Sequence, residues 1–357
     1  MAPPRICLSM IVKNESPVIH RCLASVRPWI DHWVIVDTGS SDGTQDQVRA
    51  ALAGVPGSLH ERPWQDFAHN RNEALDLARA QADYVLFIDA DEQLVMPRDF
   101  QWPALGGDGY LFRCELNGWH YGRNSLIATR LDWRWVGVLH EFLTCDRPHR
   151  WELLPGPQIV VGRDGARARD PSTYLKDIDV LHQALQREPG HTRYTFYLAQ
   201  TYRDAGLLED SVRCYRLRMA QDGWDEERWF SAFQVAVLCE RLQQPAAEVQ
   251  QAYLAAYAMR PSRAEPLCEL ARYLRQRGEH AMASLYAARA AAMALPQDVL
   301  FVDASVYAWR ALDELASSAW YAGALDEGRQ AIARLMAQQR FPETERQRIE
   351  NNARFYA

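Results

Sequence analysis

The first part of the chain alternates short apolar runs with amphipathic segments. The most apolar runs are short, as buried strands are, and polar or turn residues flank them. They lie at 6–12, 33–36 and 84–88. Helical spacing predicts helices over 17–26 and 70–82, with a further helix after the polar turn at 39–43. Strands that alternate with helices predict a Rossmann-like α/β domain with a mostly parallel sheet covered on both faces.

Two of these helices carry start signals. Ser16 and Pro17 supply a cap and a first-turn proline for the helix over 17–26. Thr44 and Gln47 have the spacing of a capping box, which predicts that the next helix begins at Thr44.

From about Asp170 the pattern changes to long helical segments, and none of the later runs has the character of a strand. Small and apolar residues recur at intervals close to 36 residues, with one longer insertion: Leu198-Ala199, Val235-Ala236, Leu270-Ala271 and Ala316. This interval is similar to that of tetratricopeptide helix pairs, and Pro189, Pro261 and Pro296 fall where helices must stop. We therefore expect an α/β domain over 1–168 and an all-α, tetratricopeptide-like helical-repeat domain over 169–357; an irregular helical domain is the alternative.

Composition excludes several classes of protein. Hydrophobic residues make up 48% and charged residues 24% of the chain, as in ordinary globular proteins, and the net charge of −6 argues against a nucleic-acid partner. We expect no membrane span, because no window approaches the roughly 20 apolar residues that one needs, and the N-terminus lacks the features of a secretory signal. The seven cysteines form no C-x-x-C pair, which favours reduced, packed thiols in a cytoplasmic protein.

The strongest candidate chemistry lies directly after the apolar run at 84–88. Asp89 and Asp91 stand two residues apart there, so their carboxylates can share a hard divalent cation, which prefers oxygen ligands. Such a cation can neutralise a diphosphate leaving group. The alternative is an acidic turn that suits a helix start.

A second candidate follows the run at 33–36. Asp37 ends that run, and a ligand is expected at the carboxyl ends of the strands in such a sheet, where this carboxylate can accept hydrogen bonds from a base or ribose. The turn Gly39-Ser40-Ser41-Asp42-Gly43 allows close approach of a ligand to the backbone. The same turn is also ordinary loop-to-helix chemistry.

Four segments taken together resemble the family 2 glycosyltransferases of GT-A fold. They are MIVKNE at 10–15, VDTGSSDGT at 36–44, Asn70-Arg71-Asn72, and FIDADE at 87–92, and they occur in the family's order. The segment 135–141 is similar to the W-x-G-x-x-H-E segment of a bacterial subgroup, some members of which carry tetratricopeptide-like helices. The resemblance covers roughly residues 5–145. It implies inverting transfer, of the hexosyltransferase type, from a nucleotide-diphosphate sugar with Mn²⁺ or Mg²⁺.

The resemblance also implies residue roles. Asp37 would bind the uracil or ribose end of a UDP-sugar, with Glu15 beside it and Asp42 as a weaker member of the same set. Arg71 would face the donor phosphates, although a surface arginine is the plain alternative. Asp91 would be the principal metal ligand, with Asp89 on the ribose or on metal-bound water.

His140 and Glu141 are the candidates for the remaining roles. An inverting transfer needs a carboxylate base on the face opposite the departing diphosphate, and Glu141 can supply it. His140 can ligate the metal or contact the diphosphate, and Asp132 is the reserve candidate for the base. The alternative is a buried pair that fixes a loop. Thr144 occupies the second histidine position of HExxH, which excludes a zinc protease on the motif.

The acceptor stays open between a peptide or protein, which a concave helical array can hold, and a glycan. Because the N-terminal domain is compact, we expect the helical array to complete the acceptor groove. The oligomeric state stays open as well, with a homodimer as one option. Two other functions compete: a non-catalytic interaction protein with a retired α/β domain, and a nucleotidyltransferase. The second would require a glycine-rich, basic loop after the first strand, and 11–16 is not one.

Overall fold

The protein is described by a computed structural model that covers residues 3–116 and 118–356. Its contacts divide the chain into two compact units. The first comprises Met1–Asn117 and Tyr121–Glu188, and the second comprises Gly118–His120 and Pro189–Ala357. The contacts thus place the helix α5 (Thr173–Arg187) with the first unit. The boundary expected at residues 168 and 169 stays a prediction.

The sheet of the first unit is mixed, with a parallel core. Its strands lie in the order β3-β2-β1-β4-β7-β6-β10-β5. Their bounds are β1 (Ile6–Val12), β2 (His32–Asp37), β3 (Gly57–Glu61), β4 (Tyr84–Phe87), β5 (Gln93–Val95), β6 (Gly109–Leu116), β7 (Trp119–Ala128) and β10 (Trp151–Val160). Strands β3, β2, β1 and β4 pair in parallel, whereas β7 runs antiparallel to β4 and β5 antiparallel to β10. A separate ribbon pairs β8 (Arg134–Val136) with β9 (Phe142–Thr144).

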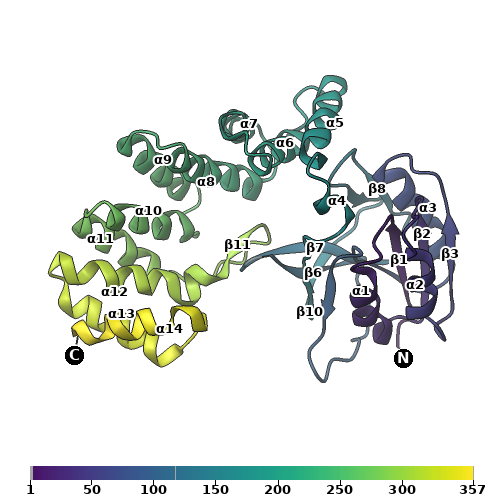
Figure 1. Cartoon of the computed structure of the whole chain (residues 1–357), viewed down its shortest axis with the longest axis horizontal. Helices are drawn as coiled ribbons and strands as arrows, with labels where there is room; N and C mark the ends of the chain where they lie inside the picture. Colours follow the sequence, from purple (N-terminus) through teal and green to yellow (C-terminus); the bar gives the residue numbers. More distant parts are fainter. Residues whose placement is uncertain (1–2, 117, 357) are drawn as a thin grey trace. The chain divides into compact units, whose positions relative to one another are not determined.

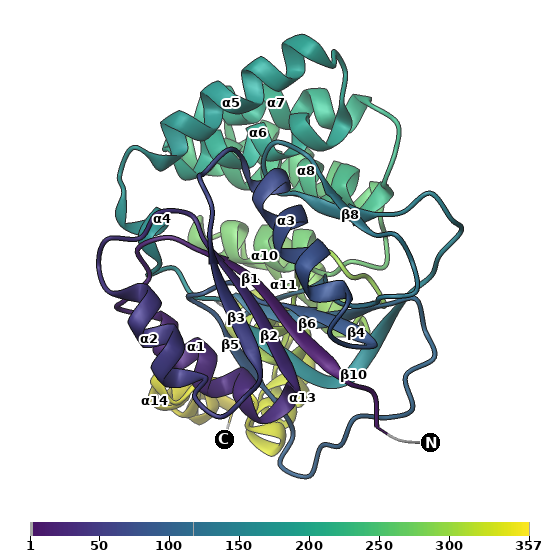
Figure 2. The ribbon, with the colours of Figure 1, turned by 90° about the vertical axis from the view of Figure 1, so that its right-hand side faces the viewer.

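Helices cover both faces of the parallel core, which confirms the predicted α/β class. Ile6, Leu8 and Met10 alternate along β1 and share a buried cluster with residues of α1 (Ile19–Val26) and α2 (Thr44–Ala51). Cys7 points to the other face and packs in a second cluster with α3 (Phe67–Arg79). Figure 2 shows α3 on one side of these strands, with α1 and α2 on the other. Short helical segments complete the unit: η1 (Arg27–Trp29) and α4 (Ala166–Arg169).

The predicted start of α2 is right in position but not in its cap. The helix begins at Thr44, yet Gly43 is the cap residue, has a left-handed conformation with φ of 89°, and makes no side-chain cap. The Thr44 hydroxyl is occupied elsewhere, because it donates to Asp42 (2.6 Å) and accepts from the backbone N–H of Glu15 (2.9 Å). The capping box with Gln47 is therefore wrong.

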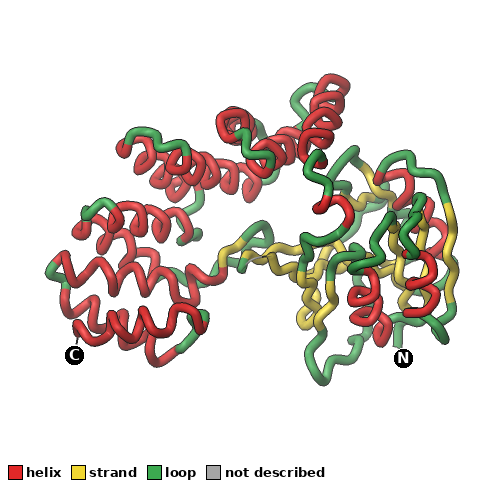
Figure 3. Tube along the Cα trace, in the orientation of Figure 1, coloured by secondary structure: helices red, strands yellow, loops and turns green. Residues whose placement is uncertain are grey.

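The second unit is an array of antiparallel helix pairs, which appear as consecutive coils in Figures 1 and 3. The pairs are α6 (Thr192–Asp204) with α7 (Leu208–Ala220), α8 (Asp225–Arg241) with α9 (Ala246–Met259), α10 (Glu265–Gln276) with α11 (His280–Ala291), and α12 (Ala311–Ala322) with α13 (Leu325–Gln338). The array ends with α14 (Glu343–Ala353) and η3 (Arg354–Tyr356). The four predicted repeat positions lie on α6, α8, α10 and α12, the first helix of each pair. The tetratricopeptide-like repeat is thus confirmed.

Each first helix ends in a left-handed residue that reverses the chain. Three of these residues are the glycines Gly206, Gly278 and Gly323, with φ between 75° and 80°. Gln243 holds the equivalent position after α8 with φ of 54°. Glycine suits this conformation because it has no Cβ, so the second repeat carries backbone strain that the others avoid.

The insertion between α11 and α12 corrects one expectation. It contains the short strand β11 (Val302–Asp303), which pairs antiparallel with Trp119 and His120 of β7. A π-helical turn, η2 (Val306–Arg310), then leads into α12. The described part of the helical half therefore contains one strand, and its two residues, Val302 and Asp303, are too few to show a strand pattern in the sequence.

All seven cysteines are free thiols, and all except Cys214 are buried. Within the described parts of the chain, no helix combines the length and apolarity that crossing a membrane requires.

Candidate active site

The parallel strands bring the predicted carboxylates to one edge of the sheet. β1 lies between β2 and β4 and pairs in parallel with both. Asp37 is the last residue of β2, and Asp89 follows β4 by two residues. Both therefore stand at the carboxyl edge, where α/β sheets bind ligands.

Asp37 lies beside a small cleft with one carboxylate oxygen unused. Its Oδ1 accepts from the backbone N–H groups of Gly39 (2.9 Å) and Ser40 (2.7 Å). Its Oδ2 is buried and has no hydrogen-bond partner among the described residues. Asp37, Ser40, Glu61 and Arg62 help to line a cleft of about 290 Å³. A buried unpaired oxygen is costly without a ligand, so this atom is ready to accept a hydrogen bond from one.

Asp42 makes hydrogen bonds that connect the loops at the carboxyl edge of the sheet. It accepts from the backbone N–H of Ser16 at Oδ2 (3.0 Å) and from Thr44 at Oδ1. Burial alone would raise the pKa of Asp42, but the hydrogen bonds from Thr44 and Ser16 lower it to about 2. The neighbouring Asn14, with φ of 56°, accepts from Ser41 N–H in the same junction. These contacts give Asp42 a structural task at the edge of the site.

Asp89 sits between two arginines. Arg71 on α3 donates from Nη2 to Asp89 Oδ1 at 2.7 Å, and Arg123 on β7 lies 3.5 Å from Oδ2. Burial raises the pKa of Asp89, but the two guanidinium groups more than offset it and lower the pKa to about 2. Asp89 is therefore ionised, and its charge holds both arginines at the sheet edge.

Arg71 also faces Glu141, so the site contains a line of alternating charges. Arg71 Nε lies 3.7 Å from Glu141 Oε2, and at the other end Arg123 Nη1 donates to Glu92 Oε1 at 2.7 Å. The order is Glu92, Arg123, Asp89, Arg71 and Glu141. Two positive and three negative groups alternate, which limits the cost of burying them together.

Glu141 is buried and partly unsatisfied. Its side chain is 8% exposed, and Oε1 has no hydrogen-bond partner among the described residues. Burial raises the pKa of Glu141, although Arg71 opposes the shift. A carboxylate with a raised pKa and an unused oxygen is suited to accept a proton.

The loop that carries Glu141 is held on α3 by Asn72. The Asn72 amide donates to Trp135 O (3.0 Å) and accepts from Trp135 N–H (2.8 Å), so it pairs with β8 as a strand would. The ring of Trp135 lies under Arg71, with its centroid 5.1 Å from the guanidinium carbon. Gly137, with φ of 117°, then turns the loop so closely that a Cβ would lie 3.5 Å from Glu141 Cα. Asn72, Trp135 and Gly137 thus fix the position of Glu141.

The segment around Gly165 covers two further candidates. Gly165 N–H donates to Asp91 Oδ2 (3.3 Å), and Ala166 N–H donates to Glu15 at 3.1 and 3.2 Å. Burial raises the pKa of Glu15 to about 7, although the Ala166 hydrogen bond lowers it. Burial and the nearby charge of Asp89 raise the pKa of Asp91. Both carboxylates therefore lie at the same edge and are held by backbone N–H groups.

The chain's own residues provide part of a cation site. Asp91 offers a carboxylate, whereas both oxygens of Asp89 face arginines and His140 has an exposed side chain with φ of 51°. No group of three His, Cys, Asp or Glu residues that would hold a metal occurs among residues 3–116 and 118–356. A divalent cation here would take Asp91 as a protein ligand, and ligand oxygens, such as those of a diphosphate, would fill other positions. Ligation by Asp89 or His140 stays a prediction.

Asp132 is not brought to this cluster. Its side chain is 90% exposed and lies 3.5 Å from Arg79, the last residue of α3. Arg71 is eight residues earlier on the same helix, about 12 Å away at 1.5 Å per residue. Asp132 also comes shortly after Ala128, which pairs with Tyr84 at the start of β4, whereas Asp89 comes after the end of β4. The two carboxylates therefore lie at opposite ends of this strand.

Two residues of the candidate site could not be predicted from the sequence. Arg123 lies on an antiparallel strand that has no motif, and only its pairing to Asp89 and Glu92 reveals it. Gly165 acts through its backbone N–H, which any residue except proline carries.

Among the tryptophans, Trp133 is fully buried and Trp102 packs against the main core, so both are structural.

Residues 7–98 match the family model described as Glycosyl transferase family 2. The N-terminal unit contains a family 2 glycosyltransferase domain. The matched range includes Asp37, Arg71, Asp89 and Asp91, whereas Glu141 lies beyond it. The predicted family, and with it the GT-A type of fold, is confirmed.

Three curated relatives are similar to part of the chain. A TPR repeat-containing protein of Synechococcus elongatus is 39% identical over 97 residues, which cover 27% of this chain and 22% of that protein. The SPbeta prophage-derived glycosyltransferase SunS of Bacillus subtilis is 33% identical over 89 residues, or 25% of this chain and 20% of SunS. The lipopolysaccharide core biosynthesis glycosyltransferase LpsC of Rhizobium meliloti is 34% identical over 94 residues, or 26% of this chain and 34% of LpsC. The matches therefore span between a fifth and a third of these relatives.

Proposed function

We propose that the protein transfers a sugar from a nucleotide-diphosphate sugar to an acceptor, with the family 2 domain as the catalytic unit. The observation that carries this proposal is the pairing of Arg71 with Asp89 at the carboxyl edge of the sheet, within the matched range. A domain without catalytic activity would have no need of this line of buried charges, whose residues come from four separate parts of the chain: α3, β7, the turn after β4, and the loop between β8 and β9. The interaction-protein alternative is therefore disfavoured.

The cleft at Asp37 suits a uracil base. Asp37 Oδ2 can accept the imide N–H of uracil, and the Arg62 guanidinium on the same cleft can donate to a ring carbonyl. Cytosine lacks that N–H, so the carboxylate would discriminate against it. UDP-sugars are accordingly the proposed donors.

The diphosphate would lie near Arg71 and Arg123. These guanidinium groups are held by Asp89, so their positive charge is already placed before the donor binds. A divalent cation on Asp91, when bound, would supply further neutralisation of the charge that develops on the leaving diphosphate. Mn²⁺ and Mg²⁺ both prefer such oxygen ligands.

Glu141 is the proposed general base. It would take the proton from the acceptor group as that group forms its bond to the anomeric carbon and the carbon–oxygen bond to the diphosphate breaks. Arg71 lies next to Glu141, so the base and the leaving-group site are linked through one side chain. Inversion of the anomeric configuration requires that this base act on the face of the sugar opposite the departing diphosphate.

Release of UDP tests the proposal. The protein is incubated with UDP-glucose, UDP-galactose and UDP-N-acetylglucosamine, and free UDP is measured with and without Mn²⁺. Turnover of one donor that is lost in Asp91→Asn supports the proposal. Absence of UDP release from every donor, combined with absence of UDP binding to the folded protein, contradicts it.

A further inference from the structure

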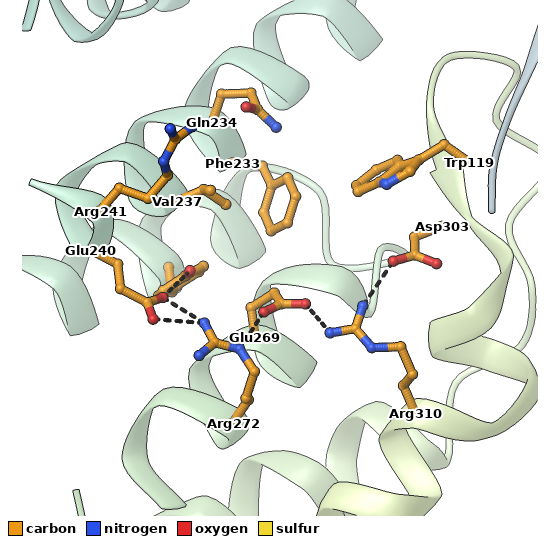
Figure 4. A pocket seen from close by; sticks show the side chains of 11 residues that line it. Trp119, Phe233, Gln234, Val237, Glu240, Arg241, Glu269, Arg272, Asp303 and Arg310 are labelled. Carbon is orange, nitrogen blue, oxygen red and sulfur yellow. Dashed lines mark hydrogen bonds and ion pairs between the residues drawn. The ribbon is translucent and has the colours of Figure 1, made fainter. Parts of the chain in front are cut away.

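A cavity of about 330 Å³ lies within the second unit, and none of its lining residues belongs to the candidate active site. It is an open pocket lined by residues of α8, α9 and α10, by Asp303 and Arg310 of the inserted segment, and by Trp119 (Figure 4). All its lining residues belong to the second unit, because Gly118–His120 cluster with the helices. The cavity is thus a property of the helical array.

Charged side chains form a continuous ladder along one side of the cavity. Arg272 donates to Glu240 (2.8 Å) and to Glu269 (2.7 Å). Arg310 donates to Asp303 (2.9 Å) and pairs with Glu269. The dashed lines in Figure 4 follow this ladder from Glu240 on α8 to Arg310 at the end of η2. Each arginine bridges two carboxylates, so the planar groups are fixed in orientation with some hydrogen-bonding capacity left.

The charges of the cavity balance. The lining contains three carboxylates and three arginines: Glu240, Glu269, Asp303, Arg241, Arg272 and Arg310. A cavity for an anion or a cation would show an excess of the opposite charge. The balance favours a neutral ligand that has many hydrogen-bonding groups.

Aromatic rings supply the other side. Trp119 and Phe233 both line the cavity, with ring centroids 6.2 Å apart and planes inclined by 44°. Trp119 is half-buried and packs by its edge on Phe230, which leaves part of its ring surface to the cavity. An aromatic face opposite fixed polar groups is the combination that binds the apolar face and the hydroxyl groups of a sugar.

The inserted segment is built to hold this arrangement. Glu226 accepts from the N–H groups of Val299 and Leu300 (2.9 and 2.7 Å), and buried Arg263 donates to Leu300 O and Phe301 O. Phe301 itself has φ of 45°, and the π-helical turn that follows ends at Arg310. Strained backbone and π-helical turns persist where the surroundings hold them, frequently at functional sites.

We propose that this cavity binds a neutral saccharide unit, with one face of the sugar against Trp119 and its hydroxyl groups on the ladder of Arg272, Glu269 and Arg310. The volume of about 330 Å³ lies at the lower end of the range for pockets that bind small molecules, which favours a compact ligand over an extended peptide. The binding site stands on the second unit alone; that the bound saccharide is part of the acceptor rests on the proposed function.

Fluorine NMR on the full chain tests this site. The twelve tryptophans are replaced biosynthetically by 5-fluorotryptophan, and the Trp119 resonance is assigned with Trp119→Phe. Cellobiose, lactose, mannobiose and N,N′-diacetylchitobiose are then titrated. We expect one of them to shift the Trp119 resonance in a saturable way while exposed Trp224, which lies outside the cavity, stays unchanged.

Val237→Arg supplies the blocking variant. Val237 is half-buried on α8 and lines the cavity, so a long side chain there fills the space without removing a ladder residue. The affinity for the saccharide should fall at least about tenfold, with the unfolding midpoint of the variant measured to show that it is folded.

Two results would overturn the inference: no disaccharide moves the Trp119 resonance, or serine- and threonine-containing heptapeptides move it instead. UDP is titrated into the same samples to separate the two proposals. UDP binding without saccharide binding would refute this site alone, and saccharide binding without UDP binding would refute the proposed function alone.

Discussion

Arg71 Nη2 donates to Asp89 Oδ1 at 2.7 Å, and the same guanidinium lies 3.7 Å from Glu141 through its Nε. One side chain on α3 therefore joins the carboxylate at the end of β4 to the carboxylate on the loop between β8 and β9. The proposed leaving-group site and the proposed base meet at this arginine.

Replacing Arg71 should weaken donor binding. Arg71→Ala removes a charge-assisted contact to the diphosphate, and we expect UDP affinity to fall about 10–100-fold. Arg71→Lys keeps the charge but loses the planar fork, so its loss should be smaller. Calorimetric titration with UDP measures both. Arg49→Ala, at an exposed position of α2, is the matched control and should bind as the wild type does. Equal affinities in all three variants would remove Arg71 from the donor site.

Glu141→Gln should strongly reduce kcat while sparing donor binding. Loss of a general base costs roughly 10²–10⁴-fold in kcat. Because burial raises the pKa of Glu141 above its ordinary value, wild-type kcat should rise with pH as this group loses its proton. The residual activity of Glu141→Gln should lack that rise. Asp132→Asn serves as the comparison, because it tests the other carboxylate proposed from the sequence; loss of activity there with Glu141→Gln active would reverse the assignment.

Asp37→Asn should alter the preference for the nucleobase of the donor. Asp37 Oδ1 accepts two backbone N–H groups, so the amide would keep its oxygen there and place its NH₂ at the Oδ2 position. That donor opposes the N–H of uracil and suits the N3 acceptor of cytosine. The ratio of UDP to CDP affinity should fall about tenfold or more. Competition titrations measure the ratio, and an unchanged ratio would place the base elsewhere.

Glu15 should make stability depend on pH. Its pKa is about 7 in the folded protein, above its ordinary value of 4.5. The folded state therefore binds this proton more tightly, and its stabilising contribution is present below about pH 4.5 and lost as the pH rises through about 7. Several buried carboxylates shift in the same direction, so only the difference between wild type and Glu15→Gln is informative. Urea unfolding across this range should show a weaker decline in the variant; parallel curves would contradict the shift.

Gln243→Gly should stabilise the second repeat. Gln243 holds φ of 54° at the position where the other first helices have glycine. Relief of this strain is worth about 1 kcal/mol, somewhat less after the added chain entropy of the unfolded state is counted. Gly206→Ala is the converse variant and should destabilise by a similar amount. Denaturant unfolding tests both, and opposite signs are the required outcome.

The sequence revealed those parts of the site that depend on local order along the chain. Asp37 ends one apolar run, and Asp89 and Asp91 come just after another. Their place at the edge of the sheet could therefore be predicted from these apolar runs alone. The repeat positions on α6, α8, α10 and α12 were visible for the same reason.

What the sequence could not reveal depends on contacts between distant residues. The part played by Arg123 became visible only when β7 paired with β4. Asn72 belongs to a motif noted in the sequence, but its hydrogen bonds to the backbone of Trp135 could not be foreseen from it. The Thr44 capping box failed because a tertiary contact to Glu15 and Asp42 took its hydroxyl. The strand β11 is likewise defined by its pairing with β7, because two residues are too few to show the alternation of a strand.

The most direct test of the central claim is calorimetric titration with UDP, GDP and TDP, each with and without Mn²⁺, on the wild type and on Asp91→Ala. The account predicts that UDP binds the wild type with an affinity that Mn²⁺ strengthens, and that Asp91→Ala loses the Mn²⁺ effect. Failure of every nucleoside diphosphate to bind the folded wild-type protein, with or without Mn²⁺, would contradict it.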